Sequence, residues 1–497
     1  MHWANFLHFY QPIDQQPDIL EAVIVQSYRP LLQGFRARPR VRLTININGS
    51  LLELFDRYGY QDLIDTLRFL GKEGRVEFTA TPKYHAILPF LSREEAARQI
   101  KAHNETCAFF LGNAYRPQGF FPTEMAWSEE LIPLIVEFGF RWVILDEIAC
   151  HRGEGTVDYA KLYRIHGTEL LAFFRERRLS NLIMSAVVRS RESLLAALGD
   201  ESGRSRYFLT AMDGETFGHH RPGLEKLLFG LMDAPEFEFI QISDLPRHYH
   251  NIREVQPISS TWASSRQDIE RGIQFLSWRD PENEIHRSQA VFTELALQAV
   301  SSMDAGGSRY AEVRKKMDAA LGSDHFWWAS AKPWWSIEMI EAGAHRLLEV
   351  ARSIPSLPPE VFAKARDHYE DIVSTAFDWQ RSGRVRRMIH AQNESIRIPF
   401  KDRTLGRGGA EQGVFYAFMS MMKRLEQEAA ARGEYEQAIL WRDAQYKLEH
   451  KHDIYDFVNA IDLLRREIPH EEVERTIQEY KAQYRKIRGG QPEQRGA

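Results

Sequence analysis

Hydrophobic positions in the first half of the chain form short, nearly continuous runs that alternate with amphipathic segments. Apolar runs of about four to eight residues, bounded by polar ones, are typical of parallel strands buried on both faces. We therefore expect strands at residues 3–9, 41–47, 76–80, 119–122, 142–146, 182–185, 207–213 and 238–243. Between them, the spacing of apolar positions predicts helices at residues 51–73, 92–111 and 128–138.

Repeated alternation of strand and helix predicts an α/β fold and favours a barrel of parallel strands. A doubly wound open sheet has the same pattern, so the pattern alone leaves both architectures open. Ser92 and Glu95 have the spacing of a capping box, which would begin the helix that follows.

After about residue 285 the strand pattern ends, and long amphipathic segments predict a helical bundle packed on the barrel. We expect helices at residues 288–302, 336–353, 367–389, 413–432, 434–466 and 471–486, interrupted by Pro355, Pro358 and Pro359. This divides the chain into a barrel at residues 1–285 and a helical domain at residues 286–487. The polar residues 488–497 are expected to form a disordered tail.

Composition narrows the class of protein. The chain has 497 residues and a formal net charge of −5, and it has no basic tract of the kind that binds nucleic acid. A run of about 18 apolar residues, which would predict a membrane span, is absent, and the N-terminus lacks the pattern of a signal peptide. We expect a cytoplasmic protein with two reduced thiols, Cys107 and Cys150, whose helical half could also form an oligomer interface.

Titratable and amide side chains recur at the predicted carboxyl ends of the strands, where the active site of an α/β barrel lies. They are His8, Gln11, Asn46, Asn48, Glu77, Glu124, Asp146, Asp213, Glu215 and Asp244. An acid after a strand is commonly a helix cap, so the recurrence carries more weight than any one position. Glu77 could face the barrel mouth or pair with a cation, and His85 could bind a sugar hydroxyl or be a loop residue.

The most crowded segment is MDGETFGHHRPG, at residues 212–223, which follows an apolar run. An acid at the end of a buried strand is costly unless something uses or pairs it. Asp213 in this segment and Glu124 in GFFPTEMAW, at residues 119–127, follow different strands. Cleavage of a glycosidic bond needs two such carboxyl groups, one that protonates the leaving oxygen and one that attacks or stabilises the sugar.

The aromatic group at residues 326–335 could cover a sugar face or pack between domains. His219 and His220 could instead be ligands of a metal ion, although the HExxH spacing of zinc enzymes is absent. Neither the GxSxG motif of serine hydrolases nor a GxxxxGK[ST] phosphate loop is present.

Five segments, in order over about residues 1–345, together resemble the sequence regions of glycoside hydrolase family 57. They are HFYQP at residues 8–12, GRVEFTATPKYHAILP at 74–89, GFFPTEMAWS at 119–128, DGETFGHHRPG at 213–223 and SDHFWWASAKPWW at 323–335. The third and fourth segments are the most specific. The first departs from the family's HQP, because two aromatic residues separate His8 from Gln11 and Pro12.

This resemblance implies a distorted (β/α)7 barrel followed by a helical bundle, and retaining chemistry on α-glucans or maltooligosaccharides without a metal or other cofactor. It implies Glu124 as the nucleophile and Asp213 as the general acid/base. The residues it implies for substrate binding are His8, Gln11, Glu77, His85, Glu215, His219, Asp324, Trp327 and Trp328. α-Amylase-like hydrolysis is the first expectation, and a 4-α-glucanotransferase or a branching enzyme is the alternative.

Two alternatives of other classes stay open from the sequence. A metal-dependent polysaccharide deacetylase could recruit Asp213, His219, His220 and His8 as ligands. A non-catalytic glucan-binding protein would keep the same carboxylates as structural residues.

Overall fold

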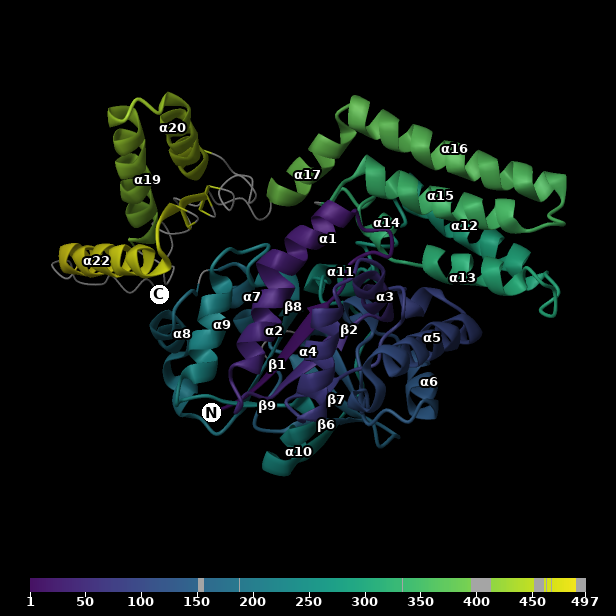
Figure 1. Ribbon diagram of the computed structural model, residues 1–497, viewed down its shortest axis with the longest axis horizontal. Coiled ribbons are helices and arrows are strands. Elements are labelled where there is room, and N and C mark those ends of the chain that lie inside the picture. The colour runs from purple at the N-terminus through teal and green to yellow at the C-terminus, as the bar shows by residue number, and fades with distance from the viewer. Residues whose placement is uncertain are drawn as a thin grey trace.

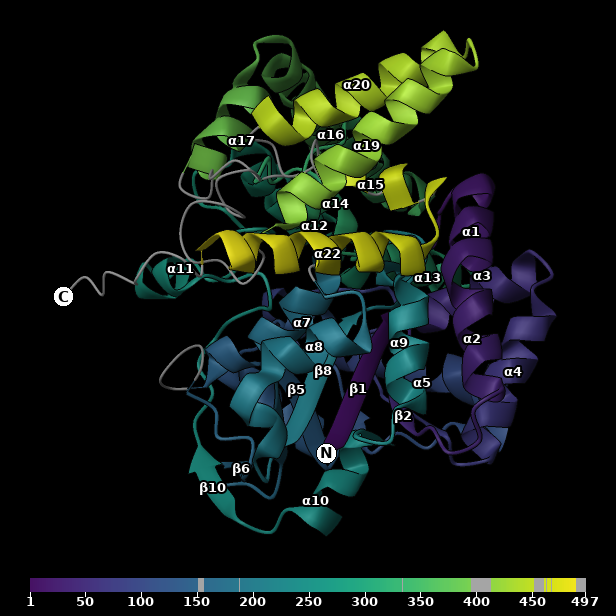
Figure 2. The ribbon, with the colours of Figure 1, turned by 90° about the vertical axis from the view of Figure 1, so that its left-hand side faces the viewer.

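The computed structural model describes residues 1–488 except residues 151–155, 187, 333, 395–412, 451–459, 462 and 466. The predicted tail lies outside the described residues, apart from Arg488 at the end of the last helix. Figures 1 and 2 show the strands gathered in one part of the molecule with helices around them, and the helices that follow residue 284 above them.

The parallel strands curl into a barrel, as predicted. The wall consists of β1 (His2–Phe9), β2 (Leu43–Ile47), β3 (Val76–Phe78), β4 (Gly119–Phe120), β5 (Trp142–Asp146), β7 (Leu171–Arg175) and β8 (Tyr207–Asp213). Parallel pairing joins β8, β1, β2 and β3, and also β4, β5 and β7. A bridge between Ala80 and Phe120 joins β3 to β4, and the Glu176 N–H donates to the Leu209 carbonyl at 2.8 Å beside β7 and β8. These two contacts close the ring, which rules out the open-sheet alternative.

Three further strands lie beside this ring: β6 (Leu162–Ile165), β9 (Glu238–Ile240) and β10 (Ile252–Val255). β6 pairs antiparallel with β7 and parallel with β10, and β9 pairs with the start of β1. The predicted strand at residues 182–185 is wrong, because this segment belongs to α7 (Arg177–Met184). Its apolar residues share one helix face with buried Leu179.

The barrel helices follow the predicted pattern with one interruption. α3 (Gly49–Arg57) and α4 (Gln61–Lys72) replace the single helix expected at residues 51–73, and Gly59, with a φ of 77°, lies between them. α5 (Arg93–Leu111) begins where predicted, since the Ser92 side chain accepts from the Glu95 N–H. The Glu95 carboxylate pairs with Arg314 of the helical half. The remaining barrel helices are α1 (Pro17–Val23), α2 (Arg29–Arg36), α6 (Ile132–Glu137), α8 (Arg191–Leu198), α9 (Leu224–Asp233), α10 (Leu245–His248) and α11 (Arg266–Glu270).

The helical half has two separate cores. The first is shared by α12 (Glu284–Ser301), α13 (Tyr310–Ala320), α15 (Ile337–Ser353), α16 (Pro359–Arg381) and α17 (Arg384–Glu394). The short α14 (Asp324–Trp327) packs instead in a small cluster around Trp278. The second is shared by α19 (Val414–Ala431), α20 (Tyr435–His450) and α22 (His470–Arg488). The division at residues 285 and 286 remains a prediction. Within the described ranges, we find no helix with both the length and the apolarity that crossing a membrane requires.

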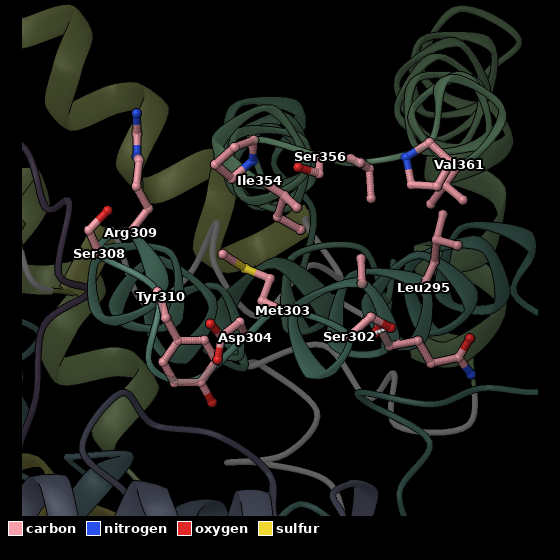
Figure 3. A pocket seen from close by; sticks show the side chains of 16 residues that line it. Leu295, Ser302, Met303, Asp304, Ser308, Arg309, Tyr310, Ile354, Ser356 and Val361 are labelled. Carbon is pink, nitrogen blue, oxygen red and sulfur yellow. Dashed lines mark hydrogen bonds between the residues drawn. The ribbon is translucent and has the colours of Figure 1, made fainter.

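A cavity of about 580 Å³ lies beside the first of these helical cores, where the end of α12, the loop that leads to α13, the segment after α15 and the start of α16 meet (Figure 3). Met303, Tyr310 and Ile354 contribute to its walls. Among the described residues that line it, none is a predicted site residue.

Candidate active site

A different cavity, of about 480 Å³, lies where the carboxyl ends of the barrel strands meet α14 and α15. Both proposed catalytic carboxyls, Glu124 and Asp213, line it. So do the predicted binding residues His8, Gln11, His85, Glu215, Asp324, Trp327 and Trp328. Folding therefore brings together residues from both halves of the chain around one opening.

Glu124 lies four residues after the end of β4, in a single turn (Thr123–Met125) in which Glu124 and Met125 are left-handed. Its φ is 59°, and that of Met125 is 50°. Each such non-glycine residue costs about 1–2 kcal/mol, so the surrounding structure must hold this turn. The Glu124 Oε2 accepts a hydrogen bond from the Trp262 Nε1–H at 2.5 Å, and Oε1 lies 3.7 Å from the His85 Nε2.

Asp213 ends β8, where it is in register with His8 on β1. Burial raises the pKa of Asp213 to about 6, although Arg175 opposes the rise. Burial and then the nearby Asp213 raise the pKa of Glu124 to about 8. Ionising both carboxyls in one buried cavity is costly, so the two hold one proton between them near neutral pH.

Glu215 is a third buried carboxyl beside Asp213. Its Oε1 accepts from the Tyr28 hydroxyl and from the Gln11 Nε2 at 2.9 Å. Its Oε2 is buried and has no hydrogen-bond partner among the described residues. Burial first, and then Asp213, raise the pKa of Glu215 to about 8. This oxygen can therefore accept a hydroxyl group of a bound molecule.

His8 and His85 form a buried chain of hydrogen bonds across the cavity wall. The His8 Nδ1 lies 2.7 Å from the Asn46 Oδ1, so it carries the proton of this ring. The His8 Nε2 then accepts from the His85 Nε2–H at 3.1 Å, and the His85 Nδ1 accepts from the Ser323 hydroxyl at 2.8 Å. Burial lowers the pKa of His8 to about 4 and that of His85 well below its usual value. Both rings are therefore neutral at pH 7.

The helical half completes the cavity wall through polar contacts. Besides the Ser323 contact, the Tyr10 hydroxyl donates to the Asp324 Oδ2 at 2.5 Å, and the Tyr10 ring stacks on His85 with centroids 3.8 Å apart. Arg346 of α15 pairs with Asp14 at the rim. The segment after α13 thus belongs to the site.

The aromatic group at residues 326–335 divides between the two roles expected for it. Trp327 and Trp328 line the cavity, and Trp327 stacks on Trp278 with centroids 5.0 Å apart. Trp335 packs in the helical core, where it stacks on Trp379.

Two predicted binding residues lie away from the cavity, which corrects the sequence analysis. Glu77 accepts from the Thr44 hydroxyl at 2.6 Å and from the Ser243 N–H at 3.1 Å. Because Thr44 is near the start of β2, these contacts hold Glu77 at the amino end of the barrel. The His219 Nδ1 lies 2.8 Å from the Gln26 side chain, outside the cavity lining.

His220 lines the cavity in place of its neighbour His219. Gly218, with a φ of 106°, shapes this loop, and a Cβ there would lie 1.9 Å from the Gln26 carbonyl. Both ring nitrogens of His8 are engaged by Asn46 and His85. The ligand set expected for a metal-dependent deacetylase is therefore not assembled by the described residues, and no other group of three or more metal-ligating side chains is found among them.

The other strand-end acids serve the structure. Asp146 is fully buried and pairs with Arg175 at 2.8 Å and Arg177 at 2.9 Å. Asp244 pairs with Arg247 at 2.6 Å near the molecular surface. Sequence reasoning also missed Tyr10, Tyr28 and Trp262, which contact the carboxyls of the site.

Comparison with known proteins adds the following findings. The sequence profile described as "Glycosyl hydrolase family 57" matches residues 7–250. The chain is 29% identical over 233 residues to an "Alpha-amylase" of Pyrococcus horikoshii, covering 45% of this chain and 36% of that protein. It is 27% identical over 224 residues to a "4-alpha-glucanotransferase" of Thermococcus kodakarensis, covering 44% of this chain and 34% of that protein. The matched segment thus spans about a third of these curated relatives.

Solved structures resemble the fold over a larger share of the chain. A 4-alpha-glucanotransferase from Thermococcus litoralis aligns with a TM-score of 0.54 and 17% identity, covering 71% of this chain and 60% of that chain. A GH57 branching enzyme from Thermococcus kodakaraensis aligns with a TM-score of 0.57 and 15% identity, covering 76% and 96%. These likenesses confirm the predicted fold, a barrel followed by helices.

Proposed function

The chain belongs to glycosyl hydrolase family 57 through residues 7–250, and from this premise we propose that it is a retaining enzyme acting on α-glucans. The observation that supports this most is that Glu124 and Asp213, which follow different strands, line one cavity with raised pKa values. Curated relatives named for hydrolysis and for glucan transfer match the same part of the chain.

In the proposed first step, a Glu124 oxygen attacks the anomeric carbon while Asp213 gives its proton to the glycosidic oxygen. The bond to the leaving sugar breaks, and a β-linked glycosyl-enzyme forms. In the second step, Asp213 takes a proton from water or a sugar hydroxyl, which then displaces Glu124 with net retention. The first step starts from the form of the pair that holds one proton, in those molecules in which Asp213 carries the proton and Glu124 is ionised.

The cavity lining fits a neutral sugar. Its charged residues are all acids, and neither Lys nor Arg is among the described residues that line it. A phosphate or carboxylate on the substrate would therefore meet repulsion. Trp327 and Trp328 offer rings for sugar faces, and Glu215 and Asp324 offer acceptors for hydroxyl groups.

Product analysis with maltooligosaccharides and amylose tests the proposal and distinguishes hydrolysis, our first expectation, from transfer. Glucose and short maltodextrins would indicate a hydrolase. A redistributed ladder without new reducing ends would indicate a transferase, and new α-1,6 branches a branching enzyme. Binding without turnover of any of these glucans would contradict the proposal.

The roles of the two carboxyls need a separate test. Glu124→Ala should abolish turnover, whereas the matched control Glu130→Ala, on an exposed neighbour in the same segment, should not. Azide added to Glu124→Ala should yield a β-glycosyl azide, since it enters from the face that the nucleophile occupied. Full activity of Glu124→Ala would refute the assignment.

A further inference from the structure

The segment at residues 260–264, which follows β10, runs beside the turn that carries Glu124. Trp127 and Ser260 form an antiparallel bridge, in which the Trp127 N–H donates to the Ser260 carbonyl at 2.8 Å. Further along the same segment, the Trp262 N–H donates to the Glu124 carbonyl at 3.1 Å. The backbone of the strained turn is thus held from this segment.

Trp262 also holds the other end of Glu124. Its indole Nε1–H donates to the Glu124 Oε2 at 2.5 Å, so one residue binds both the carbonyl and the carboxylate of Glu124. Trp262 is not among the residues that line the cavity. Its ring contacts Phe121, with centroids 5.9 Å apart, and the cavity-lining His8, with centroids 6.4 Å apart. Trp262 therefore reaches Glu124 from behind the residues that line the cavity.

Trp262 is held in turn by a buried ion pair. The Arg177 Nη2 donates to the Trp262 carbonyl at 3.0 Å, and its Nη1 donates to the Ser264 carbonyl at 2.9 Å. The Arg177 Nε donates to the Asp146 Oδ1 at 2.9 Å, and Asp146 is fully buried. This explains an acid at the end of β5 that the proposed reaction does not use.

We propose that Trp262 is the positioning residue of Glu124, and that Asp146 and Arg177 keep Trp262 in place. The proposal rests on the proposed role of Glu124 as nucleophile. The hydrogen bond occupies Oε2 and fixes the rotation of the carboxylate, so that Oε1 is the oxygen that attacks. Attack depends steeply on such orientation, because a nucleophile must lie close to the reacting carbon with its lone pair aligned.

The same hydrogen bond favours the ionised form of Glu124, because a carboxylate accepts a donor more strongly than a neutral carboxyl does. The titratable groups that face Glu124 are His85 after β3, Asp213 at the end of β8 and Asp324 in α14. Substituting Trp262 changes none of these groups. A shift in the ionisation of Glu124 would therefore report the lost indole donor.

Trp262→Phe keeps an aromatic ring and removes the indole N–H donor together with part of the ring volume, a loss of volume that the Trp142→Phe control shares. On a glucan that the parent enzyme turns over, we expect kcat to fall roughly 10- to 100-fold, as for loss of a hydrogen bond to a charged group, with a smaller change in KM. The alkaline limb of kcat/KM follows the higher pKa of the pair, that of Glu124 at about 8, and it should move to higher pH. The matched control is Trp142→Phe, which loses an indole bond to Ser243 at the other end of the barrel and should leave both quantities unchanged.

Arg177→Lys provides a second variant. It keeps the positive charge beside Asp146 but cannot donate to the carbonyls of both Trp262 and Ser264 as the guanidinium does. It should shift the alkaline limb in the same direction by less, and it is the deciding variant if Trp262→Phe does not fold. An unmoved alkaline limb in a folded variant, with kcat equal to that of Trp142→Phe, would overturn the proposal while the parent activity stands. If Glu124→Ala stays active, both the nucleophile assignment and this inference fail.

Discussion

Replacing Asp213 by Asn tests how the two carboxyls share their proton. In the parent, the pKa values of about 6 for Asp213 and about 8 for Glu124 predict a bell-shaped kcat/KM on glucans. Below the lower value both carboxyls are protonated, and Glu124 cannot attack. Above the upper value neither holds a proton for the leaving oxygen. Beyond each limit, kcat/KM should fall about tenfold per pH unit.

In Asp213→Asn, the proton donor and the negative charge beside Glu124 disappear together. Since Asp213 adds to the rise of the Glu124 pKa to about 8, its removal should lower that pKa, so the one remaining limb, on which the rate rises as Glu124 ionises, should lie below pH 8. Turnover of a maltooligosaccharide should drop by roughly 10²- to 10⁴-fold, the usual contribution of a general acid. An α-glucosyl fluoride needs no proton on its leaving group, so its fluoride release should survive and lose the alkaline limb.

The assay follows fluoride release against pH, with azide added to capture the intermediate as an α-glucosyl azide. Asp244→Asn is the matched control, because Asp244 is another strand-end acid whose partner, Arg247, is exposed. If the variant loses the same factor on glucan and fluoride, or keeps the alkaline limb on the fluoride, Asp213 is not the acid.

Three further predictions concern stability. Asp146→Ala removes the buried carboxylate that pairs with Arg175 and Arg177, and it should cost roughly 3–5 kcal/mol in urea unfolding. Asp244→Ala at a surface pair should cost about 1 kcal/mol or less, and similar losses in the two variants would contradict the buried network. Gly218→Ala places a Cβ against the Gln26 carbonyl at a position with positive φ. The free energy of unfolding, measured by thermal denaturation, should therefore fall by about 1–2 kcal/mol or more. An unchanged melting temperature would contradict this loop geometry. Glu124→Gln should have a higher melting temperature than the parent at pH 8 but not at pH 4. A carboxyl whose pKa is raised by folding destabilises the folded state only above the pKa that it has in the unfolded chain. An equal rise in melting temperature at both pH values would contradict the raised pKa of Glu124.

The strands of the barrel wall were largely predictable, because strands buried on both faces read as continuous apolar runs. β7 escaped prediction although it completes the ring, since the runs around residues 162–175 are short and form a hairpin with β6. The apolar run at residues 182–185 belongs to one face of α7. An apolar run this short is compatible with either a strand or a helix, and only the residues on either side of it distinguish the two.

The residues of the site were predictable where they follow the ends of strands. They were less predictable where the conformation of a loop determines which side chain faces the cavity. Glu77 precedes the end of its strand, and the register with Thr44 keeps it at the amino end. Whether His219 or His220 faces the cavity depends on the turn at Gly218, which residue type alone does not reveal. Trp262 carried no signal at all, because its contact with Glu124 spans 138 positions and exists only in the folded chain.

The contacts of Ser323, Asp324 and Arg346 with the barrel have a consequence for how the products of the proposed reaction could diverge. The two carboxyls come from the barrel, whereas part of the wall that an incoming water or sugar must pass comes from helices beyond the segment that the family profile matches. Under the proposed mechanism, bond breaking and acceptor choice are thus encoded in separate stretches of the chain. Changes in the helices could then favour a new acceptor and leave the two carboxyls of the barrel in place.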